Sequence, residues 1–332
     1  MGKIKRRTRC PKCGSLYVIK WSVRKGHQRY RCKDCGAMFT TRRPDVSRSN
    51  RFVWFRKWVL GKRTLESLSE ESGYSEWQLR RWFSEYLETV PEWRVPRRKG
   101  LRLLIDGTWL PDGRCVTVYR NHDRKSTLYY RFGDDESEYE ISADLIMLRE
   151  IGVTISSFTT DGSENIIRAV KYTHPHTIRQ RCLVHIEREC LSWLTQHPRT
   201  SAGIMLRRLV RQINSIRTNN DRIFWLRELD RWHEEYGEFI RQKSVNAETG
   251  EMSYTHDKVR KAYIHLKRAV PNMFKFLDRP DVPKNTNAIE SFFGHLKDNL
   301  RIHRGLSYEH KANFIKWYFF FSNEKKTTPR IE

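Results

Sequence analysis

Three acidic residues of this chain lie where carboxylates could bind a divalent cation. Asp106 follows the apolar run 103–105, and Asp161 follows a second apolar run. Glu290 lies much further along the chain, within the segment 287–293. Carboxylates at the ends of two buried strands can meet a third from a nearby helix, and hard cations such as Mg²⁺ prefer oxygen ligands of this kind. The three acids therefore predict a metal-dependent reaction.

Four of the seven cysteines form two Cys-x-x-Cys pairs, Cys10 with Cys13 and Cys32 with Cys35, separated by 18 residues. This spacing lets four thiolates hold one tetrahedral Zn²⁺, and a site closed by four protein ligands is structural. We therefore predict a zinc ribbon over residues 1–45 that folds with its metal. This use of cysteine suits a reducing compartment better than disulfides do.

The charge of the chain indicates a polyanionic partner. Lys and Arg total 64 against 39 Asp and Glu, a net charge of +25 that is spread from end to end. A basic excess of this extent is typical of a long nucleic-acid footprint. The chain has no apolar run long enough for a membrane span and no secretory signal at its start, so we expect a cytoplasmic, nucleoid-associated protein.

Residues 46–95 have the pattern of a helix-turn-helix DNA-binding domain. Gly61 ends a first helix, Thr64 begins a second, and Ser75 caps a third after a tight glycine turn. The third helix carries the side chains expected to read a DNA groove: Gln78, Arg80 and Arg81.

An ordinary helical hairpin is the alternative for this segment. We expect Trp77, Leu79 and Trp82 in the core rather than stacked on DNA. The stretch 95–100 is predicted to be an exposed linker, with Arg97 and Arg98 along a phosphate backbone.

The remaining chain alternates between strand and helix patterns. Strands are expected at 101–106, 115–119, 127–131 and 153–160, and helices around 141–148 and at 164–171. Three strands, a helix, a strand and a helix, with acids after the first and fourth strands, is the order of a ribonuclease H-like fold. The fold class is therefore mixed α/β.

Four motifs together resemble one protein family: Ile105-Asp106-Gly107, Thr160-Asp161-Gly162, Arg181-Cys182-Leu183-Val184-His185 and Asn287-x-x-Glu290-x-x-Phe293-x-x-x-Lys297. They are similar to the motifs of the Mutator-like bacterial insertion-sequence transposases, and more narrowly of members with an amino-terminal zinc ribbon. The resemblance covers essentially the whole chain.

The resemblance implies that Asp106, Asp161 and Glu290 form the DDE triad of a catalytic core. It also implies an all-helical insertion at 200–282, which divides the core into 100–199 and 283–325. The implied activity is cleavage and strand transfer at terminal inverted repeats of double-stranded DNA. Two Mg²⁺ or Mn²⁺ ions would serve each active site, and the implied assembly is a homodimer or larger.

Simpler interpretations remain for each motif. The pairs Asp161/Glu164 and Asn287/Glu290 match helix capping boxes, and Asp106-Gly107 could be a turn.

Further along the helix of Glu290, Lys297 and Arg301 fall on the same face, either to bind phosphate or as a solvated surface. For Cys182 and His185, a structural or DNA-positioning role comes first and a core pair second. A metal site with His174 and His176 comes last.

Two other functions compete with transposition. The ribbon and the helices alone would fit a non-catalytic DNA-binding regulator, but such a protein gains nothing from carboxylates aimed at phosphates. A nuclease that cuts without joining would need the same triad.

Overall fold

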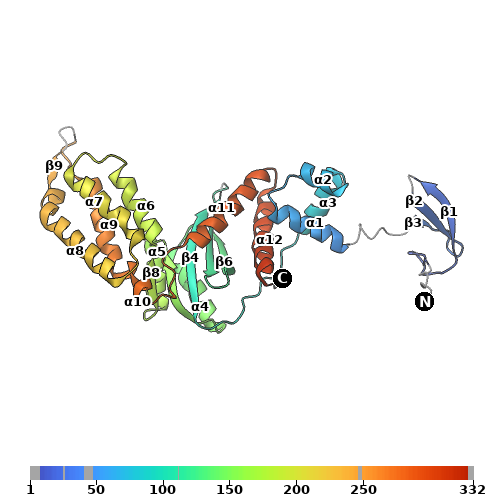
Figure 1. Ribbon diagram of the computed structural model, residues 1–332. Coiled ribbons are helices and arrows are strands. Elements are labelled where there is room, and N and C mark those ends of the chain that lie inside the picture. The colour runs from blue at the N-terminus through green and yellow to red at the C-terminus, as the bar shows by residue number, and fades with distance from the viewer. Residues whose placement is uncertain (1–7, 25–26, 41–47, 111, 246–248, 328–332) are drawn as a thin grey trace. The chain divides into compact units, whose positions relative to one another are not determined.

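The computed structural model describes residues 8–24, 27–40, 48–110, 112–245 and 249–327 (Figure 1). It divides into two compact units, Met1–Glu88 and Thr89–Glu332. The predicted boundary between ribbon and helices, at residues 45 and 46, lies outside the described residues, and the finer domain limits stay predictions.

The first unit begins with a small antiparallel sheet. Strand β1 (Val18–Arg24) pairs with β2 (His27–Cys32), which also pairs with β3 (Met38–Thr40), a strand that the sequence did not predict.

The four cysteines converge at one end of this sheet. The Sγ atoms of Cys10 and Cys35 lie 3.6 Å apart, as do those of Cys13 and Cys32, and all four lie within 4.8 Å of one another. Zn–S bonds of about 2.3 Å give a tetrahedron with edges of about 3.8 Å. The cluster can therefore hold the predicted zinc ion, and it is compatible with a zinc ribbon.

We predict one bound zinc per chain, lost in a Cys32→Ala variant because three thiolates leave the tetrahedron open. Metal analysis of the purified proteins measures this. Cys115→Ala, which removes a buried thiol of the second unit, is the control and should keep its zinc. A Cys32→Ala protein with full zinc content would contradict the assignment.

Three helices complete the first unit: α1 (Arg48–Leu60), α2 (Leu65–Ser72) and α3 (Glu76–Leu87). The predicted caps are confirmed, since the Thr64 hydroxyl accepts from the Ser67 amide at 3.1 Å and the Ser75 hydroxyl from the Gln78 amide at 3.3 Å. A shared core joins the helices: Phe55, Val59, Leu68, Leu79, Trp82 and Phe83. Their use as a DNA reader stays a prediction.

Trp77 does not lie in the core, where it was predicted. Its side chain is 68% exposed, and the Arg81 guanidinium lies over its ring at 5.2 Å. It lies two positions before Leu79 on α3, so its side chain points away from the buried face of that helix.

The second unit is built on a mixed five-stranded sheet in the order β6-β5-β4-β7-β8. The strands are β4 (Leu101–Trp109), β5 (Cys115–Asn121), β6 (Ser126–Gly133), β7 (Ile155–Thr160) and β8 (Ile178–Arg181). The pairs β4–β5 and β5–β6 are antiparallel, whereas β4–β7 and β7–β8 are parallel. The mixed α/β class is confirmed. Among the five strands of this sheet, β8 is the one that was not predicted.

Helices cover both faces of this sheet, which explains why β5 is buried along its whole length. Helices α4 (Glu138–Glu150) and α5 (Glu164–Thr173) share an apolar cluster with β4 and β7. Helices α11 (Asn287–Ile302) and α12 (Tyr308–Thr327) pack against β4 and β6 (Figure 1). The helix α11 ends at Ile302, with His303 as its C-cap.

The segment between β8 and α11 is helical, as predicted for residues 200–280. Its helices are α6 (Leu183–Leu194), α7 (Ser201–Gln212), α8 (Asn219–Tyr236), α9 (Asp257–Met273) and α10 (Lys275–Asp278), with short 3₁₀ turns η2 (Ile213–Ser215) and η3 (Phe239–Arg241). They share one apolar core. A small hairpin of β9 (Lys243–Val245) and β10 (Met252–Tyr254) was not predicted, because strands this short leave no readable alternation.

The predicted linker at 95–100 is exposed at most of its residues, as expected, but it is held against the sheet. The Trp93 indole donates to the Leu128 carbonyl at 3.1 Å, and the Thr154 amide donates to the Arg98 carbonyl at 2.8 Å. Val95 packs against the cluster under β4, so burial overrides the turn-like composition. The Arg97 side chain remains exposed and that of Arg98 is half-buried.

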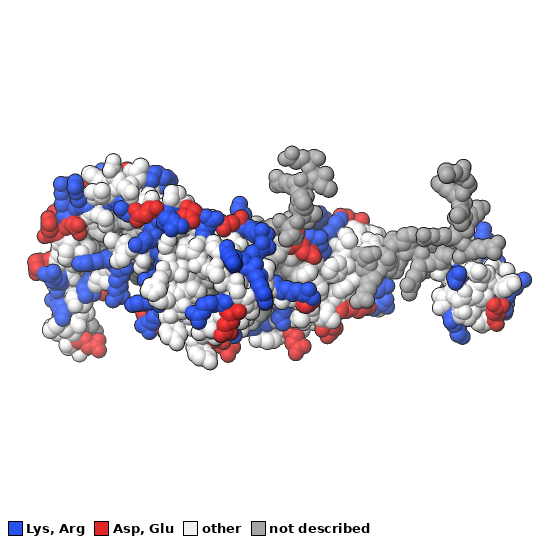
Figure 2. Space-filling view, turned by 90° about the horizontal axis from the view of Figure 1, so that it is seen from below, with Lys and Arg blue, Asp and Glu red and all other residues white. Residues whose placement is uncertain are grey.

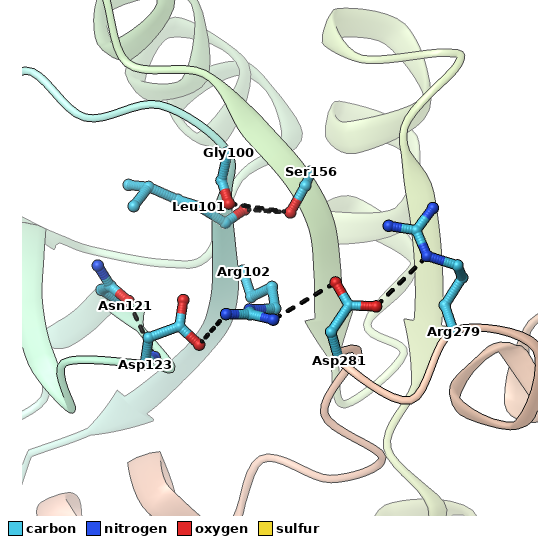
Figure 3. A network of polar contacts seen from close by, with 8 residues as sticks. All are labelled: Gly100, Leu101, Arg102, Asn121, Asp123, Ser156, Arg279 and Asp281. Carbon is cyan, nitrogen blue, oxygen red and sulfur yellow. Dashed lines mark hydrogen bonds and ion pairs between the residues drawn. The ribbon is translucent and has the colours of Figure 1, made fainter.

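Polar contacts hold the chain that leads into α11 against the start of β4 (Figure 3). The Arg102 guanidinium lies 2.7 Å from Asp123 and 3.4 Å from Asp281, and Arg279 lies 3.3 Å from the same Asp281. The Ser156 hydroxyl donates to the Gly100 and Leu101 carbonyls nearby. This network ties four chain segments, and it fixes where the approach to α11 crosses the sheet.

Candidate active site

The register of two parallel strands brings Asp106 and Asp161 together. Ile105 of β4 pairs with Thr160 of β7, so the two aspartates are the next residue on each strand. Asp161 follows β7 as predicted, but β4 continues to Trp109 and Asp106 lies within it, paired with Val118 of β5. The turn interpretation of Asp106-Gly107 is therefore wrong.

Glu290 lies in the first turn of α11, close enough to Asp106 to act on it electrostatically. Its Oε2 atom lies 2.9 Å from Arg188 Nη2, and its Oε1 atom lies 3.4 Å from His185 Nε2. The helix is capped by Thr286 without a side-chain cap, and Asn287 is already helical. The capping-box interpretation of Glu290 is wrong, and so is that of Asp161, whose Oδ1 accepts from the Ser163 amide at 2.9 Å.

Cys182 and His185 both contact Thr286, the residue that caps the helix of Glu290. The buried Cys182 sulfur accepts from the Thr286 amide at 3.3 Å, and His185 Nδ1 lies 3.3 Å from the Thr286 hydroxyl. The contact with Cys182 raises the pKa of His185 to about 9, with Asp106 and Glu290 adding to the effect. At neutral pH His185 therefore carries a positive charge beside two of the acids.

The sequence missed a fourth carboxylate. Glu136, in the loop between β6 and α4, has a buried Oε1 atom without a hydrogen-bond partner. Burial and then Asp161 raise the pKa of Glu136 to about 7. A side chain at Gly107 would place its Cβ 2.3 Å from that Oε1, so the glycine makes room for Glu136. Residues 134–140 contain several acids, and nothing in the sequence distinguishes Glu136 from the others.

Asp106 is the carboxylate whose ionised form its surroundings disfavour most. It is only 7% exposed, and no hydrogen bond or ion pair satisfies it within the described part of the chain. Burial and then Asp161 raise its pKa to about 8, and Glu136 and Glu290 add smaller effects while His185 opposes them. A buried carboxylate among like charges is stabilised by a cation.

The chemistry of this donor set suits a divalent cation, although the oxygens of Asp106, Asp161 and Glu290 do not all lie within 4.8 Å of one another. The donors are oxygens, and buried oxygens of Glu136 and Glu290 lack hydrogen-bond partners. Over residues 8–327 as far as they are described, only the four cysteines gather three or more ligand atoms within 4.8 Å of one another. Cys182 and His185 belong to no such group, and His174 instead packs against Phe158.

A basic cavity lies further along α11. It has a volume of about 450 Å³, and its lining includes Lys297 and Arg301 from α11, together with Arg304, Lys311 and Trp109. The predicted shared face of Glu290, Lys297 and Arg301 thus leads from the acids to a cationic groove. Figure 2 shows Lys and Arg side chains over much of the visible face of the second unit, with Asp and Glu among them.

The other predicted DNA-binding residues lie outside this site. Arg80 and Arg81 are exposed on α3, and Gln78 is half-buried there. Arg97 and Arg98 belong to the docked segment before β4. No helix in the part of the chain that the structure describes is long and apolar enough to cross a membrane.

A mixed sheet that gathers acids from β4, β7 and a later helix, with basic grooves around them, defines a candidate enzyme for phosphate chemistry. The family model of Mutator family transposases matches residues 117–306, and the chain belongs to this family. No curated protein matches it in a direct comparison.

We predict that Asp106→Asn stabilises the metal-free protein at high pH. Folding raises the pKa of Asp106 from about 4 to about 8, so its contribution to stability is present below pH 4 and is lost as the pH rises through 8. The amide has no such penalty, and the gain should grow with pH to a few kcal/mol, on the order of one per pKa unit. Urea unfolding between pH 5 and 8.5, roughly the span of the shift, without added divalent cations measures it.

Glu309→Gln is the control, because it removes a carboxylate on the exposed surface of α12, away from the acids of the site. A pH-independent difference for Asp106→Asn would mean that its carboxylate is not strained by its neighbours.

Proposed function

We propose that this chain is a DDE transposase with a ribonuclease H-like core, which cuts and joins DNA at the terminal inverted repeats of an insertion sequence. The observation that carries the proposal is the convergence of Asp106, Asp161 and Glu290 from two paired strands and α11. Membership of the Mutator family supplies the reaction class.

The topology supports the core assignment. An antiparallel β6-β5-β4 set continues into parallel β7 and β8, with acids in β4 and directly after β7. The helical segment α6–α10 enters between β8 and α11, so a large insertion separates the second and third acids in sequence but not in space.

The triad with Glu136 nearby would hold Mg²⁺ or Mn²⁺. Bound there, such ions would supply activation of the attacking hydroxyl and stabilisation of the leaving oxygen of a phosphodiester. Basic side chains of the protein would supply further positive charge for the DNA phosphates. His185 and Arg188 place positive charge beside Glu290, and Lys297 and Arg301 extend it along α11 toward an approaching strand.

DNA recognition is assigned to the first unit. The exposed Arg80 and Arg81 of α3 would read the repeat, with the zinc ribbon and the basic surface adding phosphate contacts. A homodimer or larger assembly on double-stranded DNA would hold the two ends of the element together.

We predict that Asp106→Asn, Asp161→Asn and Glu290→Gln each abolish cleavage and strand transfer while DNA binding stays close to wild type. Each change removes one metal-binding charge and leaves the basic surface intact. Incubation with the flanking DNA ends and Mg²⁺ reveals 3′-hydroxyl cleavage and joined products on a gel.

The matched control is Glu309→Gln, an exposed acid in the first turn of α12, and it should stay active. Wild-type protein that binds but never cuts would identify a regulator. Cutting without joined products would identify a nuclease.

We predict that the double variant Arg80→Ala/Arg81→Ala loses selectivity for the element ends. A base-edge contact is worth about 1–3 kcal/mol and relaxes sequence choice, whereas a phosphate contact weakens all DNA alike. Competition binding with repeat and scrambled duplexes separates the two. Arg227→Ala/Arg231→Ala removes two exposed charges from α8 as the control; an equal effect on both duplexes would place the reader elsewhere.

A further inference from the structure

A second basic cavity opens directly beside Asp161. It has a volume of about 450 Å³ and lies among β7, β8, α5 and α9. Four arginines contribute to its lining: Arg168, Arg179, Arg181 and Arg268. No role in the proposed chemistry has been assigned to any of them.

Three of these arginines lack an acidic partner. Within the residues that the structure describes, no carboxylate lies within 4.0 Å of the guanidinium nitrogens of Arg179, Arg181 or Arg268. The Arg181 side chain belongs to a residue only 9% exposed, and its Nε atom has no hydrogen-bond partner. The same is true of Arg179 Nη1. Buried N–H groups of a charged side chain are costly unless something accepts from them.

The two acids of the lining, Glu164 and Glu189, offset only part of the charge of its four arginines, although Glu189 acts on Arg181 electrostatically. Glu164 pairs with Arg168 at 3.2 Å, and Glu189 lies 3.1 Å from His265 Nε2. Burial and then the nearby Arg181 and Arg268 lower the pKa of His265 to about 4, so its ring is neutral at pH 7. The cavity therefore presents guanidinium groups in excess to whatever enters it.

The cavity adjoins the reacting centre through Gly162. This residue has φ of 104°, and a side chain there would place its Cβ 2.0 Å from Arg181 Cζ. The guanidinium thus lies across the backbone immediately after Asp161. An anion bound by Arg181 would be a close neighbour of a phosphate held at the triad.

We propose that this cavity binds an internucleotide phosphate of the DNA strand whose scissile phosphate lies at Asp106 and Asp161. Arg179 and Arg181 would hold it from inside the cavity and Arg268 from the exposed surface of α9. Guanidinium groups match phosphate oxygens through paired N–H donors, and the apolar part of the lining, which includes Phe158 and Ile167, suits a deoxyribose. The assignment of the anion to DNA rests on the proposed function.

The test combines protein variants with DNA in which single phosphates are replaced by neutral methylphosphonates. Arg181→Gln and Arg268→Gln are compared with wild type for binding to flanking-end duplexes without Mg²⁺. Because Arg181 is buried, Arg181→Lys and thermal unfolding check its fold, while the exposed Arg268 keeps the test open if Arg181→Gln is unstable. Lys267→Gln, the neighbour of Arg268 on α9 that does not line the cavity, is the matched control.

We expect about tenfold weaker binding for each cavity variant, the effect of one charged hydrogen bond, and a salt slope smaller by about one. One methylphosphonate position near the cleavage site should weaken wild type by a similar factor and the variants hardly further. Additive effects at every position, or losses no larger than that of Lys267→Gln, would overturn the proposal.

Inorganic phosphate distinguishes the source of the anion. Stabilisation of wild type by phosphate, absent in Arg181→Gln, without any coupled DNA position would mean that the cavity takes a free phosphate compound and that the DNA assignment is wrong. Since binding is measured without cleavage, wild-type protein that binds with a coupled position but never cuts would refute the transposase activity and still support this site.

Discussion

The register between β4 and β7 is the constraint on which the candidate site depends. Pairing of Ile105 with Thr160 places Asp106 and Asp161 on adjacent strands at the same level. A slip by one residue would turn one carboxylate to the opposite face of the sheet. Because like charges repel strongly where water is excluded, this register must be held by packing, and the apolar cluster of β4, β7, α4 and α5 provides it.

The position of Glu290 depends on a different set of contacts, because it belongs to a segment far away in sequence. The chain before α11 is bound at successive points. Asp281 pairs with Arg102, the Thr159 hydroxyl donates to the Pro283 carbonyl at 2.8 Å, and Thr286 contacts Cys182 and His185. These contacts favour the positioning interpretation of the Cys-x-x-His element, since it links the start of α6 to the cap of the helix that carries Glu290.

Features that depend on neighbouring residues, such as helix caps, could be predicted from the sequence. Thr64 and Ser75 mark helix starts because their hydroxyls satisfy free amides within three residues, and the structure has a hydroxyl–amide bond at each. The acids after apolar runs were recognisable because buried strands rarely end in an unpaired carboxylate.

Features that depend on long-range packing could not be predicted in the same way. Glu136 matters only because β4 brings Gly107 against it, and the sequence alone offers several equal acids in that loop. The segment before β4 has the composition of a linker, yet Val95 and Trp93 dock on strands that are distant in sequence. The exposure of Trp77 depends on which face of α3 the other two helices cover.

The two Asp-Gly pairs give the site its asymmetry. Each glycine allows a charged side chain to lie against the strand where a Cβ would exclude it, but the charges differ. Glu136 lies against Gly107, and Arg181 lies against Gly162. The β4 side therefore gathers negative charge, as cation binding requires, and the β7 side gathers positive charge, as phosphate binding requires. A DNA strand that crosses the sheet would pass first one of these charged regions and then the other. Their order therefore constrains the direction in which DNA can lie across the sheet.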